Sequence, residues 1–167
     1  MAKSDVQATL KACIAKFDPA TARVIRASRK RLRAVLPTAN EIVYDNYNFF
    51  VIGYSPTLRP SDTIVSLAAA ANGVGLSFYR GATLPDPQGM LLGTGKQNRS
   101  VRLPTAEVLA QRGVKALILA AIRQSKVPLP DHGHGTTLIK SVSAKQRPRR
   151  KKMQPECAAV ADADSVP

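Results

Sequence analysis

The chain contains few of the residues on which most enzymes and metal proteins depend. Among its 167 residues there is no tryptophan, and there are only two histidines, two cysteines and 11 Asp and Glu. The histidines lie together at His132 and His134, so none is left for a Ser-His or Cys-His pair elsewhere. The carboxylates show no spacing typical of a general acid–base pair or a di-iron site. We therefore predict a protein without catalytic residues and without a cofactor.

Signals for metal binding, disulfides and membranes are also scarce. The tripeptide His132-Gly133-His134 has only Asp131 as a neighbouring ligand, whereas a specific metal site needs three or four ligands on a fixed frame. No metal site is predicted. Cys13 and Cys157 are too few and too far apart to indicate a disulfide framework. No apolar run approaches the thickness of a bilayer, and no signal peptide is recognisable, so we expect a cytoplasmic protein without a membrane partner.

Positive charge is what the chain has in abundance. It contains 25 Lys and Arg, and its formal net charge is +14. Up to Ser125 there are 17 basic and 7 acidic residues, so the part that we expect to fold is itself basic. A basic surface attracts phosphates, anionic metabolites and nucleic acid, although solubility alone is an equally good explanation of the charge.

Two helices are predicted near the N-terminus. Apolar residues recur every three or four positions between residues 4 and 17, and again between residues 19 and 35. Asp18 followed by Pro19 is typical of the start of a helix. The second helix carries six basic residues between Arg23 and Arg33, most of them on a different side from its apolar residues.

A sheet is predicted from Glu41 onward, where the apolar period changes to that of a strand. The dipeptide Asn72-Gly73 indicates a two-residue hairpin turn in which both residues have positive φ. Short strands are expected on both sides of the turn at residues 93–99, and a last helix is expected after Pro104. The predicted fold class is α+β, with two N-terminal helices, an antiparallel sheet of about five strands and a C-terminal helix.

The domain boundary is predicted near Ser125. Proline and glycine interrupt the chain after this residue, and the apolar content is too low to offset the entropy lost on ordering. We therefore expect residues 1–125 to form one domain and residues 126–167 to be a disordered basic tail.

The glycine-rich turn Gly93-Thr94-Gly95-Lys96 resembles a phosphate-binding loop only superficially. Five residues separate Gly89 from Gly95, where the motif needs four, and Gln97 replaces the hydroxyl residue that would bind magnesium. Backbone amides of such a turn can still hold an anion when basic side chains lie beside them. The alternative is a tight turn whose basic side chains are simply solvated.

A ligand site follows from this turn as a hypothesis. Lys96 and Arg99 would supply its positive charge, and Tyr44 and Asn46 would supply hydrogen-bonding groups at its rim. The alternative for Tyr44 is a ring in the core whose hydroxyl finds a backbone partner. The ligand would be an anionic small molecule or a phosphate-bearing partner.

The basic tail offers a second, different site. Its run of cations resembles a nucleic-acid-binding arm, and the basic helix at residues 23–33 could act with it. Few aromatic residues are present to stack on bases, so binding would be nonspecific and strongly salt-dependent. The residues concerned are Arg147, Arg149, Arg150, Lys151 and Lys152.

The order of motifs resembles the YdhG-like family of small bacterial domains of unknown function, over roughly residues 10 to 124. The segments that carry the resemblance are Glu41-Ile42-Val43-Tyr44-Asp45-Asn46-Tyr47-Asn48, Val51-Ile52-Gly53-Tyr54, Leu76-Ser77-Phe78-Tyr79-Arg80-Gly81, Leu84-Pro85-Asp86-Pro87 and Leu92-Gly93-Thr94-Gly95-Lys96. The resemblance implies an α+β domain with an antiparallel sheet packed on helices. One branch of that family is described as a frataxin-like iron chaperone. The helices of this chain are basic, whereas an iron-loading surface would be acidic and rich in oxygen ligands.

Three functions are therefore carried forward as hypotheses. The first is a cytoplasmic, non-enzymatic binding module for an anionic small molecule or a phosphate-bearing partner. The second is a nonspecific nucleic-acid-associated protein that acts through its basic tail. The third is iron delivery, which would require ferrous binding by the folded part.

Overall fold

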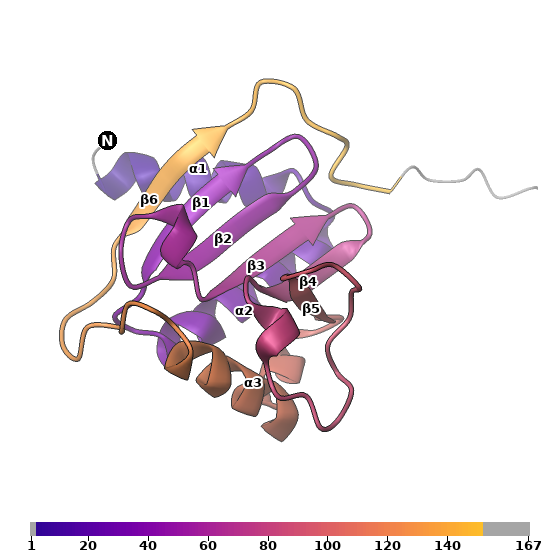
Figure 1. Cartoon of the computed structure of the whole chain (residues 1–167). Helices are drawn as coiled ribbons and strands as arrows, with labels where there is room; N and C mark the ends of the chain where they lie inside the picture. Colours follow the sequence, from indigo (N-terminus) through magenta and orange to yellow (C-terminus); the bar gives the residue numbers. More distant parts are fainter. Residues whose placement is uncertain (1–2, 152–167) are drawn as a thin grey trace, which may run out of the picture.

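A six-stranded sheet with helices packed on one side forms the centre of the molecule (Figure 1). The computed structural model describes residues 3–151. In Figure 1 the helices α1 and α2 lie behind the sheet, and α3 lies below it. The α+β fold class and the positions of all three helices in the chain are confirmed. The elements are α1 (Lys3–Ala15), α2 (Pro19–Val35), β1 (Asn40–Asp45), β2 (Phe50–Ser55), η1 (Pro60–Asp62), β3 (Val65–Ala70), β4 (Gly73–Phe78), η2 (Gly81–Thr83), β5 (Arg99–Arg102), η3 (Ala106–Ala110), α3 (Arg112–Arg123) and β6 (Thr137–Val142).

The start of α2 follows from its first two residues. The side chain of Asp18 accepts a hydrogen bond from the backbone N–H of Thr21 at 2.9 Å, which satisfies one of the free donors of the first turn. Pro19 occupies a position where its missing N–H is not needed. The apolar stripe of the helix then buries Ile25 and Leu32 against the sheet side of the molecule.

The strand order is β5-β4-β3-β2-β1-β6, so the first five strands form a simple antiparallel meander. Side chains alternate between the two faces, as the pleat requires. One row points toward the helices and is almost completely buried: Val43, Ile52, Leu67, Leu76 and Val101. The neighbouring row points to the opposite face and is more exposed: Tyr44, Val51, Ala68, Gly75 and Arg102.

The predicted hairpin is present between β3 and β4, but its turn differs from the expected one. Ala70 pairs with Gly73, so the two loop residues are Ala71 and Asn72. Of the residues in this turn, only Gly73 has a positive φ, at 130°, and every residue with a positive φ within residues 3–151 is a glycine. The expectation of positive φ at Asn72 is wrong, because the strained position falls one residue later, on the glycine that tolerates it best.

The predicted end of the domain at Ser125 is also wrong, because the folded part continues to residue 151. β6 pairs in parallel with β1 and brings the sheet to six strands (Figure 1). The low apolar content of this segment predicts disorder. However, an edge strand obtains its backbone hydrogen bonds from a partner far away in the chain, here β1. Residues 152–167 of the predicted tail lie outside the described residues.

Gly135 marks the point where the chain returns to the sheet, and it provides a first test. Its N–H donates to the carbonyl of Pro37 at 3.0 Å, and a Cβ atom at this position would lie 1.7 Å from the carbonyl oxygen of Ala39. We expect Gly135→Ala to lower the free energy of unfolding by about 1–3 kcal/mol, since backbone must move to admit the methyl group. Urea unfolding measures this loss. Gly95→Ala is the control, because a Cβ there meets no atom within 4 Å, and equal losses would refute the packing argument.

Candidate anion-binding groove

The four residues of the predicted ligand site do not come together. Tyr44 belongs to β1, and Arg99 belongs to β5, with three strands between them in the sheet. Four strand spacings of about 4.8 Å separate the two strands by about 19 Å. Asn46 directly follows β1 and so lies near Tyr44, whereas Lys96 precedes β5 and so lies near Arg99. One small ligand cannot contact both pairs.

The glycine turn at residues 93–98, directly before β5, is stabilised by the side chain of Arg99. Arg99 folds back onto this turn, where its Nη1 donates to the carbonyls of Asn98, at 2.8 Å, and Gly95. The stem of Arg99 packs on Gly81, where a Cβ atom would lie 2.5 Å from the Cβ of Arg99. Lys96 is exposed. The guanidinium of Arg99 therefore binds carbonyls of its own turn.

The side chains of Tyr44 and Asn46, four strands away from β5, share no hydrogen-bonding partner among the described residues. The hydroxyl of Tyr44 is buried and has no hydrogen-bond partner within residues 3–151, and this burial raises the pKa of the phenol. The expected backbone partner for this hydroxyl is not found there. The side-chain oxygen of Asn46 accepts from the hydroxyl of Ser141 at 3.3 Å. Asn46 therefore helps to attach β6, to which Ser141 belongs.

The basic residues of the predicted tail are fastened to the domain instead of forming a free arm. Arg149 is only 4% exposed, and its Nη2 donates to Asp45 at 2.8 Å. Arg147 lies over the ring of Tyr47, 5.6 Å from its centroid. Arg150 donates to the carbonyls of residues 15 and 16 at the end of α1, at 3.4 and 3.3 Å. Lys151 is exposed, and Lys152 lies outside the described residues.

This attachment creates a groove that the sequence did not reveal. Three cations of α2, Arg23, Arg26 and Lys30, project from one side of the helix, because their spacing of three and four residues is that of a helical face. Arg150 completes the rim from the C-terminal segment. Together they surround a hollow of about 680 Å³, which we call the basic groove. Its remaining lining is apolar: Ala15, Phe17, Pro19, Ala22 and Ala27.

The other three basic residues of α2 form ion pairs with two carboxylates. Arg29 holds the fully buried Glu41 with two hydrogen bonds of 2.8 and 2.7 Å, and Arg33 reaches the same carboxylate at 2.7 Å. Arg31 forms an exposed ion pair with Glu107 at 3.2 Å. Burial raises the pKa of Glu41, but the hydrogen bonds from Arg29 and Thr137 and the charge of Arg33 outweigh it, so that the pKa is lowered overall.

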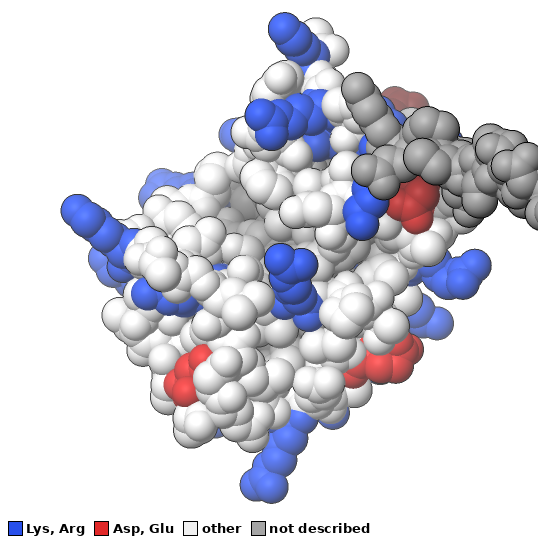
Figure 2. Space-filling model, turned by 90° about the vertical axis from the view of Figure 1, so that its right-hand side faces the viewer, with Lys and Arg blue, Asp and Glu red and all other residues white. Residues whose placement is uncertain are grey.

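The basic groove keeps its charge unpaired. None of its four cations forms an ion pair with any carboxylate in the part of the chain that the structure describes. Within residues 3–151, 24 Lys and Arg face 8 Asp and Glu. On the face shown in Figure 2, Lys and Arg are scattered widely, whereas Asp and Glu form a few isolated spots. The groove is therefore a concave region of positive potential with a low-polarity floor, which favours anions.

A second large hollow, of about 780 Å³, reaches over the open face of the sheet. Small side chains such as Ser66, Ala68 and Ser77 form much of its lining, with Phe49 and Tyr79 among the larger ones. Arg102 is the sole charged residue that lines it within residues 3–151. This hollow is therefore less suited to an anion than the basic groove.

Two further findings bear on the hypotheses. Between residues 3 and 151, no three His, Cys, Asp or Glu side chains come close enough together to hold a metal ion. No helix in that range is long and apolar enough to cross a membrane.

Comparison of the chain with family models, curated proteins and solved structures found no match. The YdhG-like resemblance therefore stays a prediction that rests on its motifs.

Proposed function

We propose that the protein is a non-enzymatic module that binds nucleic acid without sequence preference, through phosphates held in the basic groove. The observation that supports this proposal is the meeting of Arg23, Arg26, Lys30 and Arg150, from two ends of the chain, around one hollow without a paired carboxylate. It combines the basic helix and the basic C-terminal segment in one surface.

The composition of the groove favours a repeating polyanion over a single small molecule. Its cations are long, exposed side chains on a rim, and its floor offers no side-chain hydrogen-bonding group to fix the orientation of a small ligand. Arg23 and Lys30 are separated by about 10 Å along the helix axis, so successive phosphates of one strand can engage them. Arginine suits this role because its planar head binds phosphate through two parallel hydrogen bonds.

The same surface gives little means of reading a base sequence. Phe17 is the aromatic residue of the groove, but it is only 2% exposed, and its ring forms a T-shaped pair with that of Phe50 in the core. A buried ring cannot stack on a base, and stacking is the usual source of base contacts on single strands. Binding through phosphates alone is independent of sequence and depends strongly on salt.

Anisotropy of a fluorescein-labelled oligothymidylate, titrated with protein at a series of salt concentrations, tests the proposal. The double variant Arg23→Gln/Arg26→Gln should bind more weakly, and the slope of log K against log salt should become shallower by about 1.4, since each phosphate contact on a single strand contributes about 0.7. The matched control is Arg112→Gln/Lys115→Gln on α3, which removes the same charge from exposed positions outside the groove.

Two outcomes would count against nucleic-acid binding in the groove. If both double variants lower the slope equally, the contacts are spread over the whole basic surface and the groove is not the site. If a mononucleotide competes as well as the oligonucleotide does at equal phosphate concentration, the ligand is a small anion, as the first sequence-based hypothesis holds.

A further inference from the structure

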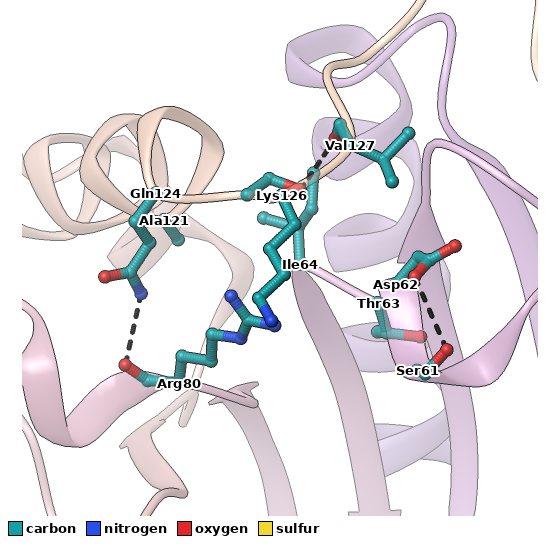
Figure 3. A pocket seen from close by; sticks show the side chains of 10 residues that line it. Ser61, Asp62, Thr63, Ile64, Arg80, Ala121, Gln124, Lys126 and Val127 are labelled. Atoms are coloured by element: carbon teal, nitrogen blue, oxygen red, sulfur yellow. Dashed lines mark hydrogen bonds between the residues drawn. The ribbon is translucent and has the colours of Figure 1, made fainter.

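A second group of cations lies away from the basic groove, in a small pocket beside the end of α3. Arg80 comes from the residues directly after β4, and Lys126 comes from the residues directly after α3. Figure 3 shows both side chains extending toward the same pocket, with Ile64 behind them. The space is about 20 Å³, roughly enough for one water-sized group, and it opens to solvent.

Neither cation has a counter-charge in the described part of the chain. No ion pair of Arg80 or Lys126 is present within residues 3–151. Asp62 lines the same pocket, but its two oxygens accept from the hydroxyls of Thr57, at 2.7 Å, and Ser61, at 3.4 Å. In Figure 3 the carboxylate of Asp62 points away from the two cations. Two like charges therefore share a pocket with nothing of opposite sign between them.

The position beside a helix C-terminus explains only part of this arrangement. The last carbonyls of a helix attract cations, and Arg123 already lies in the last turn of α3. That attraction accounts for basic residues near the end of the helix. It does not account for two cations that line the same small pocket, because like charges repel and both side chains have solvent available.

The backbone that carries the two cations is held in place. The carbonyl of Arg80 accepts from the side chains of Gln124, at 3.1 Å, and Thr83, at 3.0 Å. Ser125 donates to the carbonyl of Val127 at 2.7 Å, which fixes the chain on both sides of Lys126. The backbone at Arg80 and Lys126 is therefore fixed before any ligand binds, which lowers the entropy lost on binding.

We propose that one phosphate group, either inorganic phosphate or the end of a small phosphate monoester, binds at the solvent-facing mouth of this pocket, with one of its oxygens in the enclosed space. A phosphate monoester carries a charge of about −1.5 to −2 at pH 7, which matches the two cations. Arg80 would engage two of its oxygens, and Lys126 would act as a point charge on a third. The buried side chains of Ile64 and Ala121 form a dry wall that strengthens these interactions.

NMR titration of the full-length protein with inorganic phosphate at constant ionic strength tests the proposal. The amide resonances of Lys126 and Val127 should shift and saturate. Lys126→Gln, at an exposed position, and Arg80→Gln should each weaken binding about tenfold, as expected for the loss of one charge-assisted contact. Lys115→Gln, an exposed cation elsewhere on α3, should leave it unchanged.

The proposal is overturned if phosphate gives no saturable shifts in the unmodified protein, or if binding survives in both Lys126→Gln and Arg80→Gln. A parallel titration with glycerol phosphate separates the two sources of the phosphate group. Tighter binding of the ester identifies a small phosphorylated molecule, and equal binding identifies free phosphate. The variant Arg23→Gln/Arg26→Gln should keep its phosphate binding, because the pocket shares no residue with the basic groove.

Discussion

Replacing Glu41 by alanine should lower the free energy of unfolding by about 3–5 kcal/mol, the usual loss when one partner of a buried ion pair is removed. Glu41 has no exposed surface, and it is bound by Arg29 and Arg33 of α2. Its carboxylate also accepts from the hydroxyl of Tyr54, at 3.3 Å, and from that of Thr137, at 2.7 Å. The change would leave the buried Tyr54 hydroxyl and the half-buried Arg29 head without this partner.

Urea unfolding followed by circular dichroism measures this effect. The matched control is Glu107→Ala, which removes the same type of side chain from an exposed ion pair with Arg31 and should leave the unfolding midpoint unchanged. A loss for Glu41→Ala no larger than that for Glu107→Ala would show that the buried pair does not hold α2 and β6 onto the sheet.

The buried ion pairs of Glu41 and Asp45 could have been predicted from the sequence. Glu41, Val43 and Asp45 alternate along β1, and all three are buried on the side of the sheet that faces the helices. Strand alternation alone places the two carboxylates on the same face as Val43. Because the helices expected on that face are rich in Arg and Lys, buried ion pairs could have been predicted. The spacing of these carboxylates is not that of a catalytic pair, but it is that of two residues on one face of a strand.

Local signals predicted the elements well, whereas long-range pairing escaped them. The Asp18-Pro19 start of α2 and the hairpin before Gly73 depend on neighbouring residues and are present as helix and hairpin. β6 depends on a partner strand about 96 residues earlier, as the pairing of Glu41 with Thr137 shows. Its own sequence contains three apolar residues, but Leu138 and Ile139 are adjacent and Lys140 and Ser141 follow them, so it lacks the alternation typical of a strand. Pairing across such a distance leaves no periodicity in one sequence from which to detect it.

The predicted ligand site failed for a related reason. Tyr44 and Lys96 suit an anion by residue type, but Tyr44 lies on the first strand of an antiparallel meander and Lys96 lies shortly before the fifth. In a meander these strands are separated by all the strands between them. The basic face of α2, by contrast, was visible as a helical pattern. Its completion by Arg150 was not, because this depends on how Arg149 fastens the C-terminal segment.

Replacing Asp45 by asparagine should destabilise the protein by about 3–5 kcal/mol, and more than replacing Arg149 by methionine. Asp45 is fully buried and binds both Lys16, at 2.6 Å, and Arg149, at 2.8 Å. Removing the Asp45 carboxylate leaves the guanidinium of Arg149 without its ion-pair partner. The side chain of Arg149 is only 3% exposed and lies over the ring of Phe17. Arg149→Met instead leaves the carboxylate with Lys16, and it replaces a buried cation by an apolar chain of similar shape. Equal losses in the two variants would contradict this asymmetry.

The same cluster predicts how stability depends on pH. Burial raises the pKa of Asp45, but the hydrogen bonds from Lys16, Gln146 and Arg149 outweigh it and hold the pKa below its ordinary value of 3.8. A carboxyl with a lowered pKa in the folded state stabilises the protein fully above its unfolded pKa, and this stability is lost as the pH falls through the folded pKa. The free energy of unfolding should therefore begin to decline below about pH 5 and continue to decline as the pH falls through the lowered pKa of Asp45.

Urea unfolding at a series of pH values isolates the contribution of Asp45. Asp45→Asn should show a shallower decline in acid than the unmodified protein, because one of the groups that binds a proton on unfolding is gone. Some decline should remain, since the pKa of Glu41 is also lowered below its ordinary value of 4.5. Parallel curves for the two proteins would mean that the Asp45 carboxylate is not held by Lys16 and Arg149 in solution. In that case the C-terminal segment would not be fixed beside α1, and Arg150 would be lost from the rim of the basic groove.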